Sequence, residues 1–329
     1  MSNPNDPIPR GLDRACGHAH TFGRCVCRAY TTPDGNHIAE WIPASRSHKE
    51  IALRLNFITD NVGKIGANAL AKGLAVQCIT EHPQFGYYGI PSSSYFAIVD
   101  PILRGVESGF GWHRVRMPWG LELELVPDGQ GVHPAISDQS DPEGYGVASI
   151  DMVRRAEILL GGIHHKFYRD SPLRDTEGYF AVVRESILAL ARLKAQMDAE
   201  GLPRKIYVLA HPWYCASDLN RYQDATITMM FSPPQNVELA HLMLEYDIVP
   251  EFNSHSISRG HDELGIIDPR SSHPHSTLIG TYIDLAVADG MIPYVSFGSD
   301  AHTPSAIGSI NVRPLLRGCR RIKCLFSSA

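Results

Sequence analysis

The segment LAVQCITEHP, residues 74–83, contains the pattern on which the fold prediction depends. Its first seven residues are apolar or β-branched for the most part, and Glu81 and His82 follow them directly. A short apolar run of this kind is typical of a strand that is buried on both faces, as in a parallel sheet. We therefore expect a buried strand over residues 74–80 whose C-terminal end presents polar side chains.

The same pattern returns along the chain. Further apolar runs predict strands at residues 121–126, 157–163, 206–210, 248–252 and 293–297, and a weaker one at residues 14–17. Apolar residues at three- and four-residue spacing between these runs predict helices at residues 47–72, 92–107, 176–200, 235–245 and 277–289. Strands that alternate with helices favour βαβ units and a parallel sheet. The fold class is therefore α/β, and an α/β barrel is expected.

Two long connections interrupt this alternation, at residues 24–46 and 253–275. Long ordered loops in compact domains are often functional. No linker, internal repeat, charge block or low-complexity stretch divides the chain. We therefore expect a single domain over residues 1–329.

Composition excludes several classes of protein. The chain has 329 residues, 43% of them hydrophobic and 20% charged, and its net charge is −5. Such a chain is not expected to bind nucleic acid or an anionic membrane through bulk positive charge. An anionic substrate stays open, because bound metal cations would reverse the local field.

Neither a membrane span nor a signal peptide is expected. No apolar run approaches the roughly 20 residues that cross a bilayer, and the first residues are polar and proline-rich. The seven cysteines are scattered and odd in number, which favours a reducing cytoplasm over a disulfide framework. The oligomeric state is left open.

Metal-ligand residue types follow almost every predicted strand. They are His18, His20, Glu81, His82, Glu122, His164, His211, Asp300 and His302. In an α/β barrel the C-terminal ends of all strands meet at one face, so these side chains would converge there. So many imidazoles and carboxylates exceed the needs of one ion and suit two or three ions bridged by a carboxylate.

Each of these signals is weak alone. A histidine before proline, as at His211, is commonly a turn residue, and Glu122 and Glu124 alternate with apolar residues as in a half-exposed strand. In the pair His164-His165 we expect only His164 to face the site. The prediction therefore depends on the whole set, because chance would not place ligand types after so many separate strands.

The ordered blocks of the chain resemble the PHP (polymerase and histidinol phosphatase) superfamily. They read H-x-H-T, T-E-H-P, G-L-E, G-x-x-H-H, A-H-P, E-F-N and G-S-D-A-H between His18 and His302, and are most similar to the histidinol-phosphatase branch. The resemblance implies a distorted (β/α)7 TIM-like barrel with the metal site at the C-terminal ends of the strands. It implies two or three divalent ions (Zn, Mn or Fe), with Glu122 as the bridging carboxylate.

The resemblance also implies an activity. The expected enzyme is a metal-dependent phosphatase that hydrolyses a small, histidinol-phosphate-like phosphomonoester with a metal-activated water. Asp300 and His302 are the candidate residues for proton transfer, and Arg259 is the candidate cation beside the substrate phosphate. The expected partner is thus a small phosphorylated molecule.

Three alternatives stay open. The same cluster of ligands suits hydrolysis of amides or lactones, or oxidation with iron and O2. It also suits a metal-binding module without catalytic activity. The identity of the metal and a screen of phosphoesters, with and without oxygen, would separate these alternatives.

Overall fold

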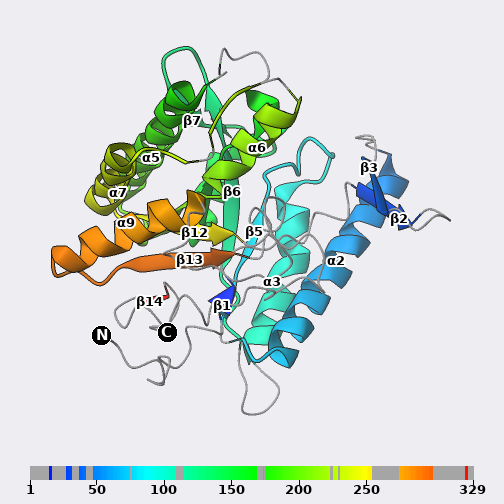
Figure 1. The fold of residues 1–329 in the computed structure, drawn as a ribbon. Coiled ribbons are helices and arrows are strands. Elements are labelled where there is room, and N and C mark those ends of the chain that lie inside the picture. The colour runs from blue at the N-terminus through cyan, green and yellow to red at the C-terminus, as the bar shows by residue number, and fades with distance from the viewer. Residues whose placement is uncertain are drawn as a thin grey trace.

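A curled, largely parallel sheet forms the centre of the computed structural model (Figure 1). The structure describes residues 15–16, 27–31, 37–41, 47–74, 76–108, 115–168, 173, 175–222, 225–228, 230–253, 274–298 and 323–324. The sheet has eight strands. They are β5 (Ile79–Glu81), β6 (Trp119–Pro127), β7 (Val132–Pro134), β10 (Ile158–Gly162), β11 (Ile206–Ala210), β12 (Ile248–Asn253), β13 (Tyr294–Gly298) and β14 (Lys323–Cys324).

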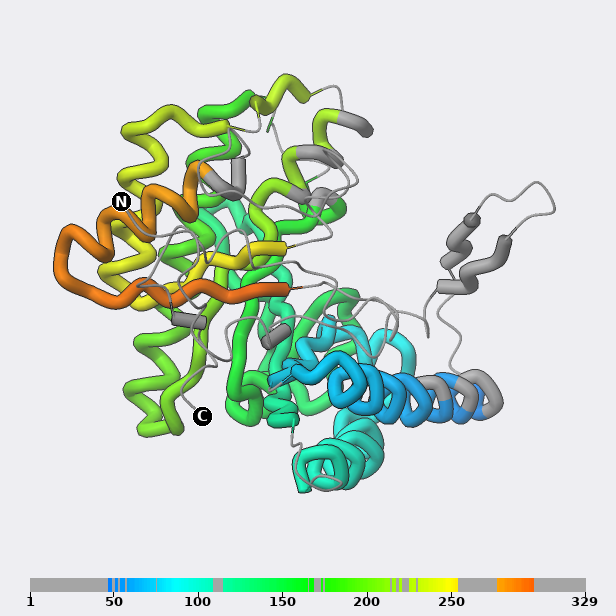
Figure 2. Tube along the Cα trace, turned by 60° about the horizontal axis from the view of Figure 1, so that its bottom comes forward, coloured from blue at the N-terminus to red at the C-terminus, as the bar shows by residue number. Residues whose placement is uncertain are grey.

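The strand order is β14-β13-β12-β11-β10-β6-β5, and β7 pairs with β6 outside this path. All neighbours along the path are parallel, whereas β7 is antiparallel to β6. Figure 2 shows β12 and β13 side by side in yellow and orange, as their pairing requires. The parallel register places the C-terminal ends of the paired strands on one side of the molecule.

A short strand lies at the open side of this sheet. Strand β1 (Ala15–Cys16) pairs in parallel with β4 (Val76–Gln77), which directly precedes β5, and β1 also lies next to β13. Strand β1 thus lies between β4 and β13, an arrangement consistent with the expected TIM-like barrel. Two further pairs are β2 (Cys27–Thr31) with β3 (His37–Trp41), antiparallel, and β8 (Ile136–Ser137) with β9 (Ala148–Ser149), parallel.

Helices cover the outside of the sheet, with α5, α7 and α9 on one side and α2 and α3 on the other (Figure 1). Capping residues set where two of them begin. The Asp175 side chain accepts a hydrogen bond from the backbone N–H of Gly178 at the start of α5, and Ser232 forms a capping box with Gln235 before α7. The helices are α2 (His48–Ala71), α3 (Ser92–Ser108), α4 (Ile150–Arg155), the 3-10 helix η2 (His165–Phe167), α5 (Thr176–Ala199), α6 (Pro212–Tyr222), α7 (Pro233–Tyr246) and α9 (Pro274–Ala288).

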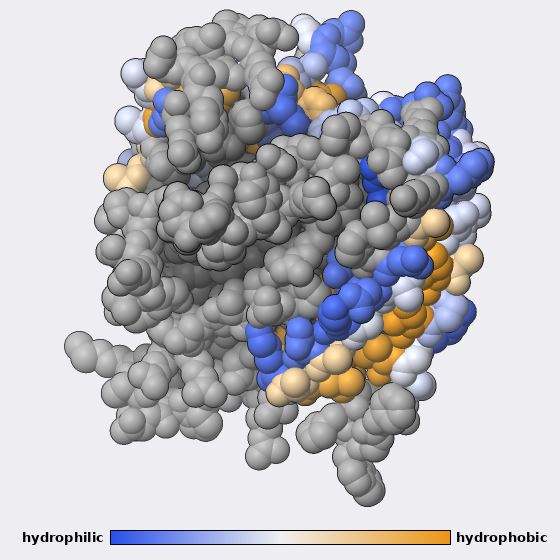
Figure 3. Space-filling model, turned by 90° about the vertical axis from the view of Figure 1, so that its right-hand side faces the viewer, coloured by the Kyte–Doolittle hydropathy of each residue, from blue (hydrophilic) through white to orange (hydrophobic). Residues whose placement is uncertain are grey.

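Apolar helix faces pack on the sheet to form the core. Ile58, Val62 and Ile65 of α2 are fully buried, while Asp60 and Lys64 on its opposite face are exposed and form an ion pair. Figure 3, which views the side of the molecule where α2 lies, shows adjacent hydrophilic and hydrophobic bands among the described residues. In the described part of the chain, no helix combines the length and apolar content needed to cross a bilayer.

The predicted elements agree with this architecture. The expected helices and strands are confirmed, with ends that differ by a few residues, except that the strand expected over residues 74–80 is two short strands, β4 and β5. Residues 24–46, expected as a loop, contain the β2–β3 hairpin, and the expectation was wrong there because each strand is only five residues long and mixes polar with apolar residues. The short helices α4 and α6 were not expected. The segment 254–273 of the other long connection lies outside the described residues.

Candidate metal centre

Strand β6 places two carboxylates inside the curled sheet. Successive side chains of a strand point to opposite faces, so Glu122 and Glu124 share one face and Leu123 lies on the other. All three are buried, with an exposed fraction of 1% or less. The half-exposed interpretation of this alternation is therefore wrong, because helices cover the leucine face and the sheet encloses the carboxylate face.

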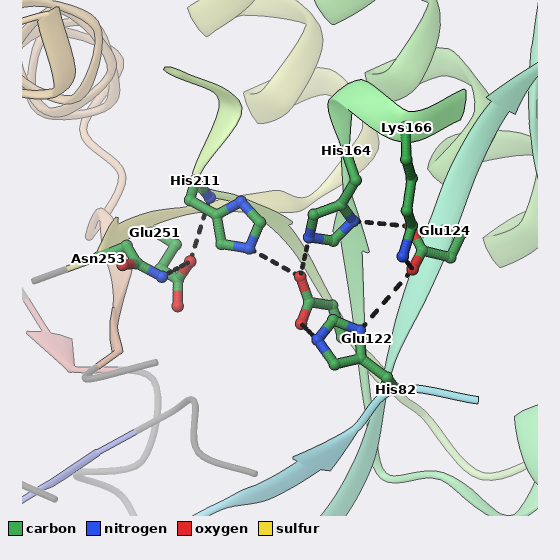
Figure 4. Close-up of polar contacts among 8 residues, drawn as sticks. All are labelled: His82, Glu122, Glu124, His164, Lys166, His211, Glu251 and Asn253. Carbon is green, nitrogen blue, oxygen red and sulfur yellow. Dashed lines mark hydrogen bonds and ion pairs between the residues drawn. The ribbon is translucent and has the colours of Figure 1, made fainter. Parts of the chain in front are cut away.

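Three histidines from three other strand ends surround the Glu122 carboxylate (Figure 4). His82 follows β5, His164 follows β10 and His211 follows β11. The Nε2 atoms of His164 and His211 lie 3.4 Å and 2.7 Å from Glu122 Oε1. The Nε2 atom of His82 lies 3.4 Å from the other oxygen, Oε2. The predicted convergence is thus observed for these four residues.

The donor set of this cluster fits a divalent metal ion. His82, Glu122 and His164 each offer a ligand atom, and these atoms all lie within 4.8 Å of one another. Two ligand atoms about 2.1 Å from a tetrahedral ion lie roughly 3.4 Å apart, which is the separation of both Nε2 atoms from Glu122. Imidazole and carboxylate together suit Zn, Mn or Fe.

Both oxygens of Glu122 face histidine nitrogens. Its Oε1 atom faces His164 and His211, whereas its Oε2 atom faces His82. A carboxylate with ligand nitrogens at both of its oxygens has the arrangement of a bridging ligand. Burying such a charge is costly unless cations or hydrogen bonds compensate it.

Glu124 lies on the far side of two of these rings. Its Oε2 atom is 2.6 Å from His164 Nδ1, and its Oε1 atom is 3.0 Å from Lys166 Nζ and 3.8 Å from His82 Nδ1. Burial raises the pKa of the Glu124 carboxyl, but His164, Lys166 and His82 outweigh burial and lower this pKa from 4.5 to about 2. Glu124 is therefore an anion at neutral pH.

Two adjacent glycines of β10 leave room on both faces of the sheet. A Cβ atom on Gly162 would lie 2.6 Å from Glu122 Oε1 and 2.8 Å from His164 Cε1. A Cβ atom on Gly161 would lie 2.7 Å from a Leu125 methyl and 2.9 Å from a Leu190 methyl. Gly162 thus makes space for the cluster, and Gly161 makes space for the contact between β6 and α5.

His211 lies in a strained turn between β11 and α6. Its φ angle is +25°, which is unusual for a residue with a side chain. Its backbone N–H donates to Glu251 Oε2, 3.2 Å away, and Asn253 Nδ2 donates to the same oxygen. The next residue begins α6, and the Tyr179 hydroxyl of α5 donates to the Pro212 carbonyl. These contacts hold the turn and thereby place the imidazole.

The Tyr179 hydroxyl stays protonated over the usual pH range. Its side chain is fully buried, and burial raises its pKa well above the ordinary value of 10. A neutral hydroxyl can keep donating its proton to the Pro212 carbonyl. The hydrogen bond from the Tyr179 hydroxyl to the Pro212 carbonyl is therefore independent of pH under physiological conditions.

Glu81 departs from the predicted ligand set. In the register of the parallel pair it is the partner of Leu121, so it belongs to the face opposite Glu122. Its Oε1 atom accepts a hydrogen bond from the hydroxyl group of Tyr95 in α3. The oxygen of that Tyr95 hydroxyl in turn accepts a hydrogen bond from Trp119 Nε1. The prediction placed Glu81 in the cluster because it follows the predicted strand 74–80, but strand alternation turns Glu81 to the face opposite Glu122.

Other predicted site residues lie outside the described part of the chain. They are His18, His20, Arg259, Asp300 and His302. The strands that precede four of them in the sequence are described: β1 ends at Cys16 and β13 ends at Gly298, and these two strands lie next to each other. The roles assigned to these five residues stay predictions.

Sequence reasoning assigned no role to three polar residues beside the cluster, Glu124, Glu251 and Asn253, and it considered Lys166 only as one of several cations that could bind the substrate phosphate. Two signals were present in the sequence. Glu124 is two positions from Glu122, so strand alternation places it on the same face, and Glu251 and Asn253 have that spacing on β12. The contact of Lys166 with Glu124 had no such signal, because Lys166 lies in the short helix η2 after His164.

Comparisons with known proteins give limited similarity. No protein-family model and no curated protein sequence matches the chain. A solved structure of histidinol phosphate phosphatase from Lactococcus lactis subsp. lactis, complexed with zinc, L-histidinol and phosphate, is similar with a TM-score of 0.47 and 14% identity, over 94% of this chain and 96% of that one. The ochratoxinase of A. niger is similar with a TM-score of 0.36 and 11% identity, over 93% and 71%. At these scores neither structure adds to the argument on chemistry.

Proposed function

We propose that this chain is a metal-dependent hydrolase that cleaves a small phosphomonoester. The observation that carries the metal-dependent part is the placement of three histidines, from three strand ends, around the buried Glu122 carboxylate. The resemblance of the ordered sequence blocks to the histidinol-phosphatase branch supports the phosphoester part. A substrate similar to histidinol phosphate is therefore the first candidate.

The residues that would hold the ions come from several strands. His82, Glu122, His164 and His211 form the described part of the site and would hold ions through their imidazole nitrogens and the Glu122 carboxylate. His18, His20, Asp300 and His302 are proposed to complete a centre of two or three Zn, Mn or Fe ions. When bound, such ions stabilise negative charge on phosphoryl oxygens and promote ionisation of water at neutral pH.

The chain itself contributes a dry, rigid and acidic interior. Glu122 and His211 have exposed fractions of only 1% and 2%, so bulk water is kept from their polar atoms. Glu251 fixes the backbone of His211, and Gly162 leaves the space that the Glu122 carboxylate occupies. Polar groups that are already fixed in position need little reorganisation free energy during a reaction. Asp300 and His302 are proposed to move protons, and Arg259 to bind the substrate phosphate.

Two measurements test the proposal. The metal content of the purified protein should show at least two equivalents of Zn, Mn or Fe per chain. The protein reloaded with that metal should then release phosphate from at least one phosphomonoester in a broad panel that includes histidinol phosphate. The Glu122→Ala variant should lose both properties, whereas Glu157→Gln, an exposed carboxylate paired with Arg116, should keep both.

Other outcomes would identify the alternatives. Metal binding without phosphate release, together with cleavage of an amide or a lactone, would replace the phosphatase assignment with another hydrolase. Consumption of O2 by the iron form would indicate an oxygenase. Metal binding with no activity in any assay would leave a binding module, and absence of bound metal would refute the proposal as a whole.

A further inference from the structure

Two imidazole rings of the cluster lie between the same two carboxylates. The Nε2 atoms of His82 and His164 face Glu122, while their Nδ1 atoms face Glu124. Glu122 and Glu124 are two positions apart on β6, so alternation along the strand gives them this shared orientation. Glu124 therefore contacts the rings at the nitrogen atoms that face away from Glu122.

The contact with His164 is short and directional. His164 Nδ1 lies 2.6 Å from Glu124 Oε2, as a ring N–H that donates to a carboxylate does. A neutral imidazole has one protonated nitrogen, so a proton on Nδ1 leaves the lone pair on Nε2. This lone pair then faces Glu122 Oε1 at 3.4 Å, and both atoms are of types that bind a divalent cation.

Lys166 holds the other oxygen of Glu124. Its Nζ atom lies 3.0 Å from Glu124 Oε1 and 3.9 Å from the centre of the Tyr145 ring, and its side chain is only 26% exposed. Glu124 itself has no exposed surface. A Cβ atom on Gly146 would lie 2.6 Å from Glu124 Cγ, so the backbone packs directly on this side chain. The carboxylate is thus fixed by charge and by packing.

We infer that Glu124 and Lys166 form a positioning pair that fixes the Nδ1–H form of His164 and directs its Nε2 atom to the metal site. This inference rests on the proposed function, because it assigns the pair to the same metal centre. Glu124 is assigned here as a residue that orients a ligand and not as a ligand itself. Lys166 is assigned to Glu124 and not to the substrate phosphate.

The first measurement is zinc affinity, determined by competition with a chromophoric chelator. Glu124→Gln should weaken zinc binding about 10–100-fold, the range for loss of a group that orients a ligand. Lys166→Met should weaken it as well, and Lys166→Arg, which keeps the charge, should restore it to within about twofold of the unchanged protein. The matched control is Glu157→Gln, at the opposite end of β10, which should not alter the affinity.

The double variant distinguishes a pair from two independent effects. If Lys166 acts through Glu124, the combined Glu124→Gln and Lys166→Met variant should bind zinc as weakly as Glu124→Gln alone. A double variant whose loss of zinc affinity equals the product of the two single losses would overturn the inference. So would an unchanged affinity of Glu124→Gln, or the loss of one whole equivalent of zinc, since a lost equivalent would make Glu124 a ligand. If Glu124→Gln fails to fold, the zinc affinities of Lys166→Met and Lys166→Arg still test the inference, and equal affinities of these two variants would overturn it.

A second measurement is independent of metal. In metal-free protein labelled with 15N-histidine, the His164 ring should show a protonated Nδ1 and an unprotonated Nε2, with the signal assigned by its loss in His164→Gln. Glu124→Gln should shift this ring toward a mixture of the two forms, and a spectrum that does not change would overturn the inference. Failure of the proposed function looks different: phosphate release is absent while the ring form and its dependence on Glu124 persist.

Discussion

His211 Nε2 lies 2.7 Å from Glu122 Oε1, although the two residues are 89 positions apart in the sequence. Glu122 lies within β6 and His211 directly follows β11, and β10 separates these two strands in the sheet. The contact crosses the interior of the curled sheet and does not follow its hydrogen-bonded ladder. Side chains from strands that are not neighbours meet in this way when a sheet curls toward a barrel.

Replacement of Glu122 should abolish metal binding. Glu122→Gln keeps the size of the side chain but removes the charge between three imidazoles. We expect at least a 100-fold loss of zinc affinity, because loss of a group that merely orients a ligand already costs 10–100-fold. Isothermal titration calorimetry measures the change. Retention of near-normal affinity would show that Glu122 is not a ligand.

The adjacent glycines of β10 should respond differently to the same substitution. Gly162→Ala places a methyl group 2.6 Å from Glu122 Oε1, so zinc affinity should fall markedly. Gly161→Ala places it against Leu125 and Leu190, so stability should fall by about 1–3 kcal/mol while zinc affinity is kept. Urea unfolding and zinc titration of both variants test this contrast. Equal effects on zinc binding would contradict it.

Removal of the Tyr179 hydroxyl should destabilise the protein. Tyr179→Phe leaves the Pro212 carbonyl without its hydroxyl donor in a buried region, which should cost about 1–3 kcal/mol in the free energy of unfolding. Tyr207→Phe is the matched control, since that hydroxyl is buried and has no hydrogen-bond partner among the described residues. The control should cost less than Tyr179→Phe in urea unfolding. The reverse order would argue against the assigned contact.

Zinc should stabilise the folded protein, and calcium should not. A ligand that binds only the folded state adds about 2.7 kcal/mol when its concentration is 100 times its dissociation constant. The imidazole nitrogens of the cluster suit zinc, whereas calcium requires oxygen ligands. Thermal unfolding with each metal, and with a chelator, measures the difference. A midpoint that is insensitive to zinc would contradict a metal site in this cluster.

Much of the fold follows from local sequence pattern. The apolar runs at β6, β10 and β11 are short and rich in aliphatic residues, so their length and composition locate them as buried strands. His82, His164 and His211 were predicted because each follows such a run. Their meeting at Glu122 could be inferred only from the barrel, in which the strand ends share one face. The single domain and the cytoplasmic location stay predictions.

The errors have equally local causes. Alternation of glutamate with leucine on β6 is the same for a half-exposed strand and for a strand with carboxylates inside a barrel, so burial of Glu124 could not be read from it. Glu81 was assigned because it follows a predicted strand, although its place on β5 turns it to the face opposite Glu122. The turn at His211 depends on Glu251 and Tyr179, which are distant in sequence.

The two glycines of β10 make the wall of the curled sheet unusually thin at one point. Methyl groups of Leu125 and Leu190 press on it from the helix side, and the Glu122 carboxylate lies against it from within. Only the β10 backbone separates the leucine methyl groups from the Glu122 carboxylate there. A displacement of α5 would therefore move the backbone against the carboxylate directly, because no side chain lies between them. The packing of α5 on the sheet and the position of Glu122 in the cluster therefore depend on each other. A substitution designed to change one of them has to be tested for its effect on the other.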